Sequence, residues 1–198
     1  MVALIFSGSL VLAQAEFSAD IFDLQKSTSQ AQAKIYFTKD KMRAEPQGTT
    51  KGAGAIIMDF SKQTSVVIMT QQHMYMEMPA QSQSQRIGYA FFETGDVENA
   101  CGDWQKAGHN DGRSCHKVGS DSVNGRSAVK YESTGANGET NHFWLDTKLR
   151  FPIKWEGKGS SGELRNIQEG AQAASLFEVP AGFTKMQMPG GMMQMPQR

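Results

Sequence analysis

From residue 16 onward, short runs of alternating apolar and polar residues are separated by turn-forming residues. The turns recur roughly every 8 to 12 positions, a spacing that is typical of an all-β sheet or barrel. Residues 151–155 alternate most cleanly, residues 74–78 alternate until Pro79, and Asn124-Gly125 is a strong hairpin dipeptide. About ten strands, mostly joined as consecutive hairpins, predict a large and strongly curved antiparallel sheet.

Helical patterns are few. Residues 82–92 are a candidate helix, residues 96–105 a short second helix capped by Asp96, and residues 171–177 a final turn. Because these segments gather in one insertion and at the end, we expect them to cover one face of the sheet. The predicted fold is mainly β, a curved sheet or half-open barrel with a few covering helices, in a single domain at residues 16–185.

The first fifteen residues, MVALIFSGSLVLAQA, carry no charged side chain. Their apolar stretch is shorter than the roughly 20 residues that a membrane-spanning helix needs. It ends in Ala13-Gln14-Ala15, a pattern that signal peptidase accepts, although no Lys or Arg precedes it. Residues 1–15 are therefore predicted to be a cleaved signal peptide, with a buried N-terminal strand as the alternative. Since no later segment approaches a membrane span, we expect a periplasmic protein without a transmembrane segment.

The chain has two cysteines, Cys101 and Cys115. In an oxidising compartment, a close pair usually forms a disulfide, and closing a loop of this size stabilises the fold by about 3 kcal/mol. The alternative is a metal site that combines both thiols with His109 and His116. Zinc fingers use tight cysteine pairs, which are missing here, so we predict the disulfide.

Charge and motif content exclude several classes of function. The 20 Lys and Arg residues balance the 20 Asp and Glu residues without a basic cluster, which argues against nucleic-acid binding. Neither G-x-S-x-G nor H-E-x-x-H occurs, and the four histidines are scattered. The G-x-G-x-x-G pattern at residues 157–162 precedes a predicted strand, so it is a hairpin turn and not a phosphate-binding loop. We predict a protein that is not an enzyme and has no resident cofactor.

Twelve methionines are the unusual feature of the composition. Methionine lines adaptable apolar surfaces, so three methionines on one side of a predicted strand indicate the lining of a cavity for a lipid or another lipophilic ligand. Residues 151–155 supply a second apolar strand face. The predicted lining is Met74, Met76, Met78, Phe151, Ile153 and Trp155.

Thioether sulfur is also a soft ligand that selects Cu(I). Residues 186–198 are predicted to be a flexible tail, in which no core position explains the methionines. Copper binding is therefore the alternative function, and copper the alternative cofactor. The candidate ligands are His73, Met186, Met188, Met192, Met193 and Met195.

Several short motifs follow one another over nearly all of the chain after residue 15. They are Lys41-Met42-Arg43, Met74-Tyr75-Met76-Glu77-Met78-Pro79, Cys101, Cys115-His116-Lys117-Val118-Gly119, Val123-Asn124-Gly125-Arg126, Trp144-Leu145-Asp146, Leu149-Arg150-Phe151-Pro152-Ile153-Lys154, Leu164-Arg165-Asn166-Ile167 and residues 176–183. In this order they resemble a family of exported bacterial proteins of uncharacterised function, related to the outer-membrane lipoprotein carrier (LolA-like) superfamily.

The resemblance implies a half-open antiparallel barrel whose concave apolar face is covered by helices and binds acyl chains or other lipophilic cargo. No cargo-contacting residue of the lipoprotein carrier matches this chain, so lipoprotein transport is not carried over. The leading hypothesis is a non-enzymatic periplasmic binding protein for a lipophilic small molecule or acyl chain. The alternatives are a copper-binding protein and an envelope interaction domain that binds a protein and no small ligand.

Overall fold

The computed structural model describes residues 16–26, 29–48, 54–79, 96–106, 114–135 and 137–186. The predicted signal peptide, the predicted helix at residues 82–92 and the tail beyond Met186 lie outside the described residues. In the part of the chain that is described, no helix is long and apolar enough to cross a membrane.

Twelve strands form one sheet, in the order β12-β6-β5-β4-β3-β2-β1-β11-β10-β9-β8-β7. The chain meanders from β1 to β6, begins a second meander at β7, and returns through β11 to pair with β1. All neighbours are antiparallel except β12 and β6, which are parallel. The strands are β1 (Phe17–Asp23), β2 (Ala33–Phe37), β3 (Lys41–Pro46), β4 (Ala55–Asp59), β5 (Thr64–Met69), β6 (Met74–Pro79), β7 (Ser114–Val123), β8 (Arg126–Thr134), β9 (Thr140–Asp146), β10 (Pro152–Gly157), β11 (Ser160–Glu169) and β12 (Thr184–Lys185).

Within the described residues, three short helical segments accompany the sheet: η1 (Val97–Asn99), α2 (Ala100–Lys106) and η2 (Ala174–Phe177). Asp96 caps the first of them, because its carboxylate accepts a hydrogen bond from the Glu98 amide at 2.9 Å. The predicted cap at Asp96 is therefore confirmed, although the first turn that it caps is a 3-10 turn before the α-helix begins.

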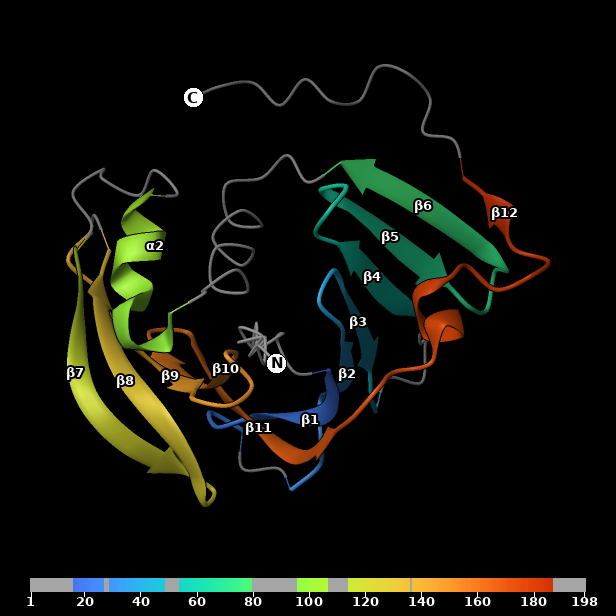
Figure 1. The fold of residues 1–198 in the computed structure, drawn as a ribbon. Helices are drawn as coiled ribbons and strands as arrows, with labels where there is room; N and C mark the ends of the chain where they lie inside the picture. Colours follow the sequence, from blue (N-terminus) through green and yellow to red (C-terminus); the bar gives the residue numbers. More distant parts are fainter. Residues whose placement is uncertain are drawn as a thin grey trace, which may run out of the picture.

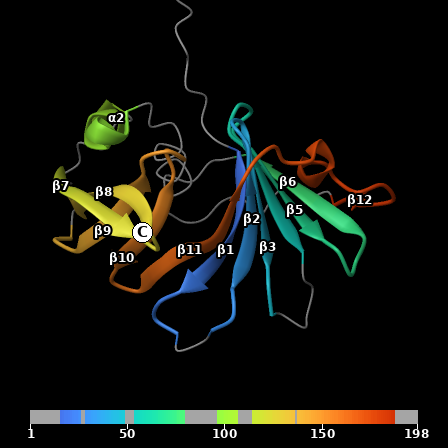
Figure 2. The same ribbon diagram turned by 60° about the horizontal axis from the view of Figure 1, so that its bottom comes forward.

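The sheet curves strongly, with β7 and β8 at one end and β4 to β6 at the other rising on either side of β1, β10 and β11 (Figures 1 and 2). α2 lies inside this curve. The register shifts in β11 opposite residues 18–20, in β10 and in β7. Asn166, at the first of these bulges, has a φ of 52°. Because each bulge adds local twist, these positions help an otherwise regular meander to bend.

We call the face that α2 covers the concave face. Trp155 lies on it, and its ring covers Gly162, where an added Cβ would stand only 2.4 Å from the indole. On the same face, the Phe151 ring packs edge-on against Phe17 and Phe37, with centroids 5.0 and 4.7 Å away. Burying such side chains contributes about 1.5–3 kcal/mol each. The cluster around these rings has the buried members Phe17, Ala19, Ile35, Phe37, Val123, Ala128, Trp144, Leu149, Phe151, Ile153 and Leu164.

The opposite, convex face carries a smaller cluster under η2. Phe177 of η2 packs with Ala55, Ile57 and Ile68 of β4 and β5. Arg43 fixes this turn by donating a hydrogen bond to the Leu176 carbonyl at 2.8 Å. The C-terminal segment is thus anchored on the convex face before it reaches the sheet edge at β12.

The mainly β, open and curved sheet that the sequence predicts is confirmed. The number of strands differs: the sequence predicts about ten, and the part of the chain that the structure describes has twelve. β12 was missed because it has two residues that are held by backbone pairing to β6 and show no alternation. β7 starts at Ser114, earlier than the predicted residue 118. The sequence did not indicate this start, because most side chains of β7 are exposed and give no apolar pattern.

Candidate functional site

Strands β3 to β6 present methionines on the concave face. Met42 pairs in register with Phe37, whose ring lies in the concave core, and this fixes the face of every aligned side chain further along the sheet. The aligned pairs on that face are Met42 with Met58, Ser65 with Met78, Val67 with Met76, and Met69 with Met74.

β12 adds a seventh methionine to this surface. Thr184 pairs with Met74, and the Met186 amide donates to the Tyr75 carbonyl at 2.7 Å, which places Met186 beside Met76. Every methionine of the described residues therefore lies on one surface, and each is half-buried. We call this surface the methionine face: Met42, Met58, Met69, Met74, Met76, Met78 and Met186.

Ser65 lies in the middle of the methionine face, between Met58 and Met78. It is 2% exposed, and its hydroxyl is the one buried side-chain polar atom of the described residues without a hydrogen-bond partner. An unsatisfied buried hydroxyl costs about 1–3 kcal/mol. The hydrogen-bonding capacity of this hydroxyl is therefore unused within the described residues.

The other end of the concave face is closed. Val97 and Ala100 pack on a buried cluster that includes Val129 and Leu145. The Tyr131 hydroxyl donates to the Val97 carbonyl at 2.6 Å and accepts from the Ala100 amide at 3.2 Å. Burial raises the pKa of Tyr131, so its hydroxyl keeps the proton that it donates.

The predicted disulfide between Cys101 of α2 and Cys115 of β7 is confirmed, with their Cα atoms 5.5 Å apart. It ties α2 to the edge strand of the sheet. We call β7 to β9 with α2 the closed arm, and β3 to β6 the open arm.

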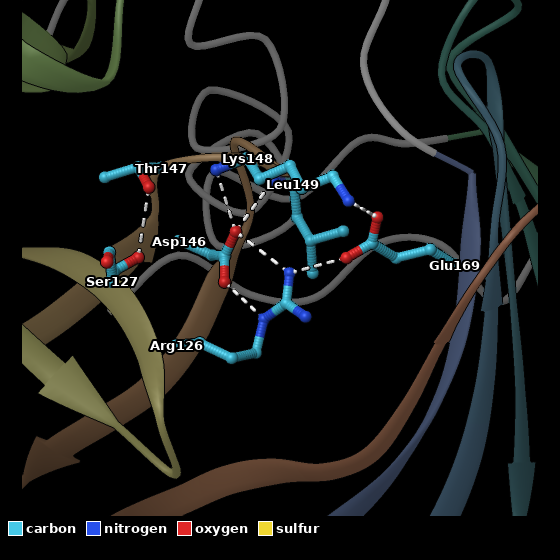
Figure 3. A network of polar contacts seen from close by, with 7 residues as sticks. All are labelled: Arg126, Ser127, Asp146, Thr147, Lys148, Leu149 and Glu169. Carbon is cyan, nitrogen blue, oxygen red and sulfur yellow. Dashed lines mark hydrogen bonds and ion pairs between the residues drawn. The ribbon is translucent and has the colours of Figure 1, made fainter.

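A polar network joins Arg126 at the start of β8, Asp146 at the end of β9 and Glu169 at the end of β11 (Figure 3). Asp146, which is 1% exposed, accepts from Arg126 at 2.5 and 3.2 Å and from the amides of Lys148 and Leu149 at 2.9 and 2.7 Å. The hydrogen bond to Asp146 raises the pKa of Arg126. Glu169 accepts from Lys148 and Arg126, and these contacts lower its pKa. This network links β8 and β9 of the closed arm to β11.

The six predicted lining residues share the concave face but fall into two environments. Met74, Met76 and Met78 belong to the half-buried methionine face. The other three pack elsewhere: Phe151 and Ile153, 5% and 1% exposed, are part of the aromatic core, and Trp155 lies between that core and the closed arm. Contact of any of the six with a ligand stays a prediction.

Sequence reasoning missed Met42, Met58, Met69 and Ser65. Each of the three methionines is the only methionine of its own strand, and only the pairing of strands brings these residues into one surface. The available signal was that each methionine lies at an apolar position of an alternating run, but a sequence does not show which runs pair.

Of the candidate copper ligands of the sequence, the structure describes His73 and Met186. His73 lies in the turn before β6, with its ring 5.4 Å from that of Phe183, which packs with the convex cluster. Met186 lies on the concave side, and the remaining candidates, Met188, Met192, Met193 and Met195, are outside the described residues. Within the described residues, no group of three or more His, Cys, Asp or Glu side chains is placed to hold a metal ion.

Unlike the apolar concave face, the convex face of the closed arm carries polar side chains. The Glu132 carboxylate lies 3.0 Å from His142 Nε2 and 3.7 Å from His116 Nε2. Next to them is an open pocket of about 440 Å³. Its lining is mostly polar and comprises Leu24, Gln25, Thr140, His142, Glu156, Gly157 and Ser161.

The architecture is that of one open, curved and almost entirely antiparallel sheet. No family model matches the chain, and no curated protein matches it. Among solved structures, an uncharacterised conserved protein from Thermus thermophilus is similar, with a TM-score of 0.54, 7% identity, and 87% of this chain and 90% of that chain covered.

MucB in the MucA/MucB complex of Pseudomonas aeruginosa has a TM-score of 0.51 and 13% identity, over 87% of this chain and 58% of that chain. The chain therefore spans little more than half of MucB. A LolA superfamily protein from Nitrosomonas europaea also matches, with a TM-score of 0.36 and 11% identity, over 83% and 90% of the two chains. At these identities the similarity is one of fold.

Proposed function

We propose that this chain is a non-enzymatic periplasmic binding protein that holds an acyl lipid against its methionine face. The observation that carries the proposal is the gathering of seven half-buried methionines on the concave side of an open sheet. Methionine is unbranched and has three rotatable side-chain bonds, so such a surface adapts to a flexible chain better than a surface of branched residues does. Burying an acyl chain there contributes about 0.8 kcal/mol per CH₂ group.

Ser65 narrows the class of ligand. A plain hydrocarbon would leave its buried hydroxyl without a partner, whereas an ester or carboxyl oxygen of an acyl lipid would accept its hydrogen bond. The proposed ligand is therefore an acyl ester or fatty acid, with its polar oxygen at Ser65 and its chain across the methionines. An envelope protein is the second candidate ligand for the same surface, since MucB, which has a similar fold, forms a complex with the protein MucA.

The first experiment is native mass spectrometry of the protein purified from the periplasm, before and after mild organic extraction. We expect a discrete adduct that extraction removes and whose mass identifies an acyl compound. A polypeptide that carries no adduct, and that afterwards fails to bind a fluorescent fatty acid, contradicts the proposal.

Substitution then locates the ligand. Met76→Glu puts a charge on the methionine face and should weaken fatty-acid binding more than it lowers the melting temperature. Val118→Glu is the matched control, because Val118 is 51% exposed on β7, far from this surface. Equal binding by the two variants removes β6 from the site.

Ser65→Ala tests the polar end of the ligand. Removing an unsatisfied hydroxyl should leave the free energy of unfolding unchanged or raise it by up to about 1 kcal/mol. The same change should weaken the binding of a fatty acid more than the binding of an alkane of equal length. A uniform loss for both ligands would show that Ser65 makes no hydrogen bond to the lipid.

A further inference from the structure

Hydrophobicity alone does not explain why the open arm uses methionine. Strands favour β-branched and aromatic residues, and the rest of the concave face follows that preference with Phe, Ile, Tyr and Trp. Among the described residues, all methionines are in the open arm and at its β12 edge. At similar volume and similar hydrophobicity, methionine differs from leucine in its flexible unbranched side chain and in its thioether sulfur.

Four of these methionines lie at the corner where β5, β6 and β12 pair. Met69 is directly opposite Met74, Met76 follows on the same side of β6, and Met186 lies beside Met76. Facing residues on neighbouring strands have Cβ atoms about 4.5–5.5 Å apart, and a methionine side chain is long and flexible enough to move its sulfur over that distance.

The fourth thioether is placed by a segment that is held at several points. Beyond η2, the Thr184 amide donates to the His73 carbonyl at 2.9 Å, and Lys185 forms an ion pair with Glu77. These contacts fix the C-terminal segment along the β6 edge and set Met186 on the concave side. The arrangement combines residues that are 117 positions apart, Met69 and Met186, at one corner of the sheet.

We propose that Met69, Met74, Met76 and Met186 form a binding site for Cu(I). Soft thioether ligands select Cu(I) over the divalent ions that prefer imidazole or carboxylate. A thioether has no proton to lose, so binding at this site does not compete with protonation between about pH 5 and 8, unlike binding at cysteine or histidine. The proposal rests on the strand register that gathers these four methionines, and it goes beyond the acyl-lipid function.

The test is titration of the full-length protein with Cu(I), supplied as its acetonitrile complex under anaerobic conditions, in competition with a colorimetric Cu(I) chelator. We expect the native chain to take a single Cu(I) from the chelator. The double variant Met69→Leu/Met74→Leu should lose this binding, because leucine keeps the apolar volume and removes the sulfur. Its melting curve shows whether it is folded.

Met42→Leu/Met58→Leu is the matched control, because these two methionines are also paired on adjacent strands of the same face but lie away from the corner. It should bind Cu(I) as the native chain does. Equal losses in the two double variants, or no binding by the native chain, would overturn the proposal.

A chain that ends at Met186 separates the corner from the later methionines of the sequence, Met188, Met192, Met193 and Met195. It should keep Cu(I) binding. If truncation abolishes binding while Met69→Leu/Met74→Leu retains it, the copper ligands are in the last twelve residues and the corner site is wrong. Equal affinity at about pH 5.5 and 7.5 supports thioether ligands, whereas a large loss at the lower pH shows histidine ligation and contradicts the proposal.

Fatty-acid binding of the same variants, measured without copper, reports on the acyl-lipid function separately. Loss of Cu(I) binding with measurable fatty-acid binding, or the reverse, distinguishes failure of one proposal from failure of the other.

Discussion

The two arms of one concave sheet face are built differently. The closed arm is covered by α2, tied by a disulfide and filled with rigid side chains such as Tyr131 and Phe143, whose rings stack at 5.2 Å. On the open arm, the described helical segment η2 packs on the opposite, convex face. The concave surface there is left to half-buried methionines. Packed rigid residues stabilise the fold, whereas flexible and partly exposed ones leave a surface that adapts to a ligand.

The difference predicts where substitutions are costly. In the closed arm and its polar network, a side chain accepts hydrogen bonds from several polar groups or packs against several apolar ones. Its removal therefore leaves unpaired polar groups or cavities. In the open arm, a methionine already exposes part of its surface, so its removal creates little new cavity. Stability should therefore be concentrated in one arm and binding in the other.

The largest effect is expected for Asp146→Ala. This change leaves the Arg126 guanidinium and the Leu149 amide without their buried acceptor and should lower the free energy of unfolding by about 3–5 kcal/mol. Denaturant titration measures the loss. Lys148→Ala, at a side chain that is 72% exposed, is the control and should cost at most about 1 kcal/mol. Similar losses of unfolding free energy in both variants would show that the polar network around Asp146 does not stabilise the closed arm.

Loss of the disulfide should come next. Cys101→Ser/Cys115→Ser opens a link between residues that are 14 positions apart and should cost about 3 kcal/mol. Hydrogen exchange should quicken in α2 and β7 and stay unchanged in β4 and β5, which the disulfide does not touch. A uniform increase over the whole sheet would contradict a division of stability between the arms.

Met58→Ala should have a smaller effect. Met58 is half-buried, so we expect a cost of about 1 kcal/mol, whereas Leu145→Ala in the closed arm, at 0% exposure, should cost about 2–5 kcal/mol. Urea titration of both variants tests the comparison directly. A cost for Met58→Ala that equals the cost for Leu145→Ala would show that the open arm is as tightly packed as the closed one.

The sequence was informative where structure is local. Alternation located most strands, cysteine spacing predicted the disulfide, and Asp96 marked the start of the helical segment. The methionine face was not predictable in full, because the meeting of Met42 with Met58 and of Met69 with Met74 depends on long-range strand register.

Period-two alternation assigns residues to two faces of a strand but not to the concave or the convex side. The curvature of the sheet determines which face is concave, and it is associated with bulges such as the one at Asn166. No sequence motif predicts the positive φ of that residue. Ser65 also could not be identified from the sequence. A serine in a strand is ordinary in sequence, and its isolation as a buried hydroxyl follows only from the residues that surround it.

The smallest expected effect is the response of the closed arm to acid. The Asp121 carboxylate accepts hydrogen bonds from the Trp144 indole and from the Ser122 amide, both at 2.7 Å, and these bonds lower its pKa below the usual 3.8. Because the folded-state pKa is the lower one, the stabilisation is present above about pH 4 and is lost as the pH falls through the folded-state value.

Asp121→Asn keeps an acceptor for the indole but does not titrate there. Denaturant titrations should therefore show a steeper loss of stability below about pH 4 in the native chain than in the variant, with a change in Trp144 fluorescence over the same range. Parallel curves for the two proteins would mean that the ionisation of Asp121 does not contribute to the acid response of the closed arm.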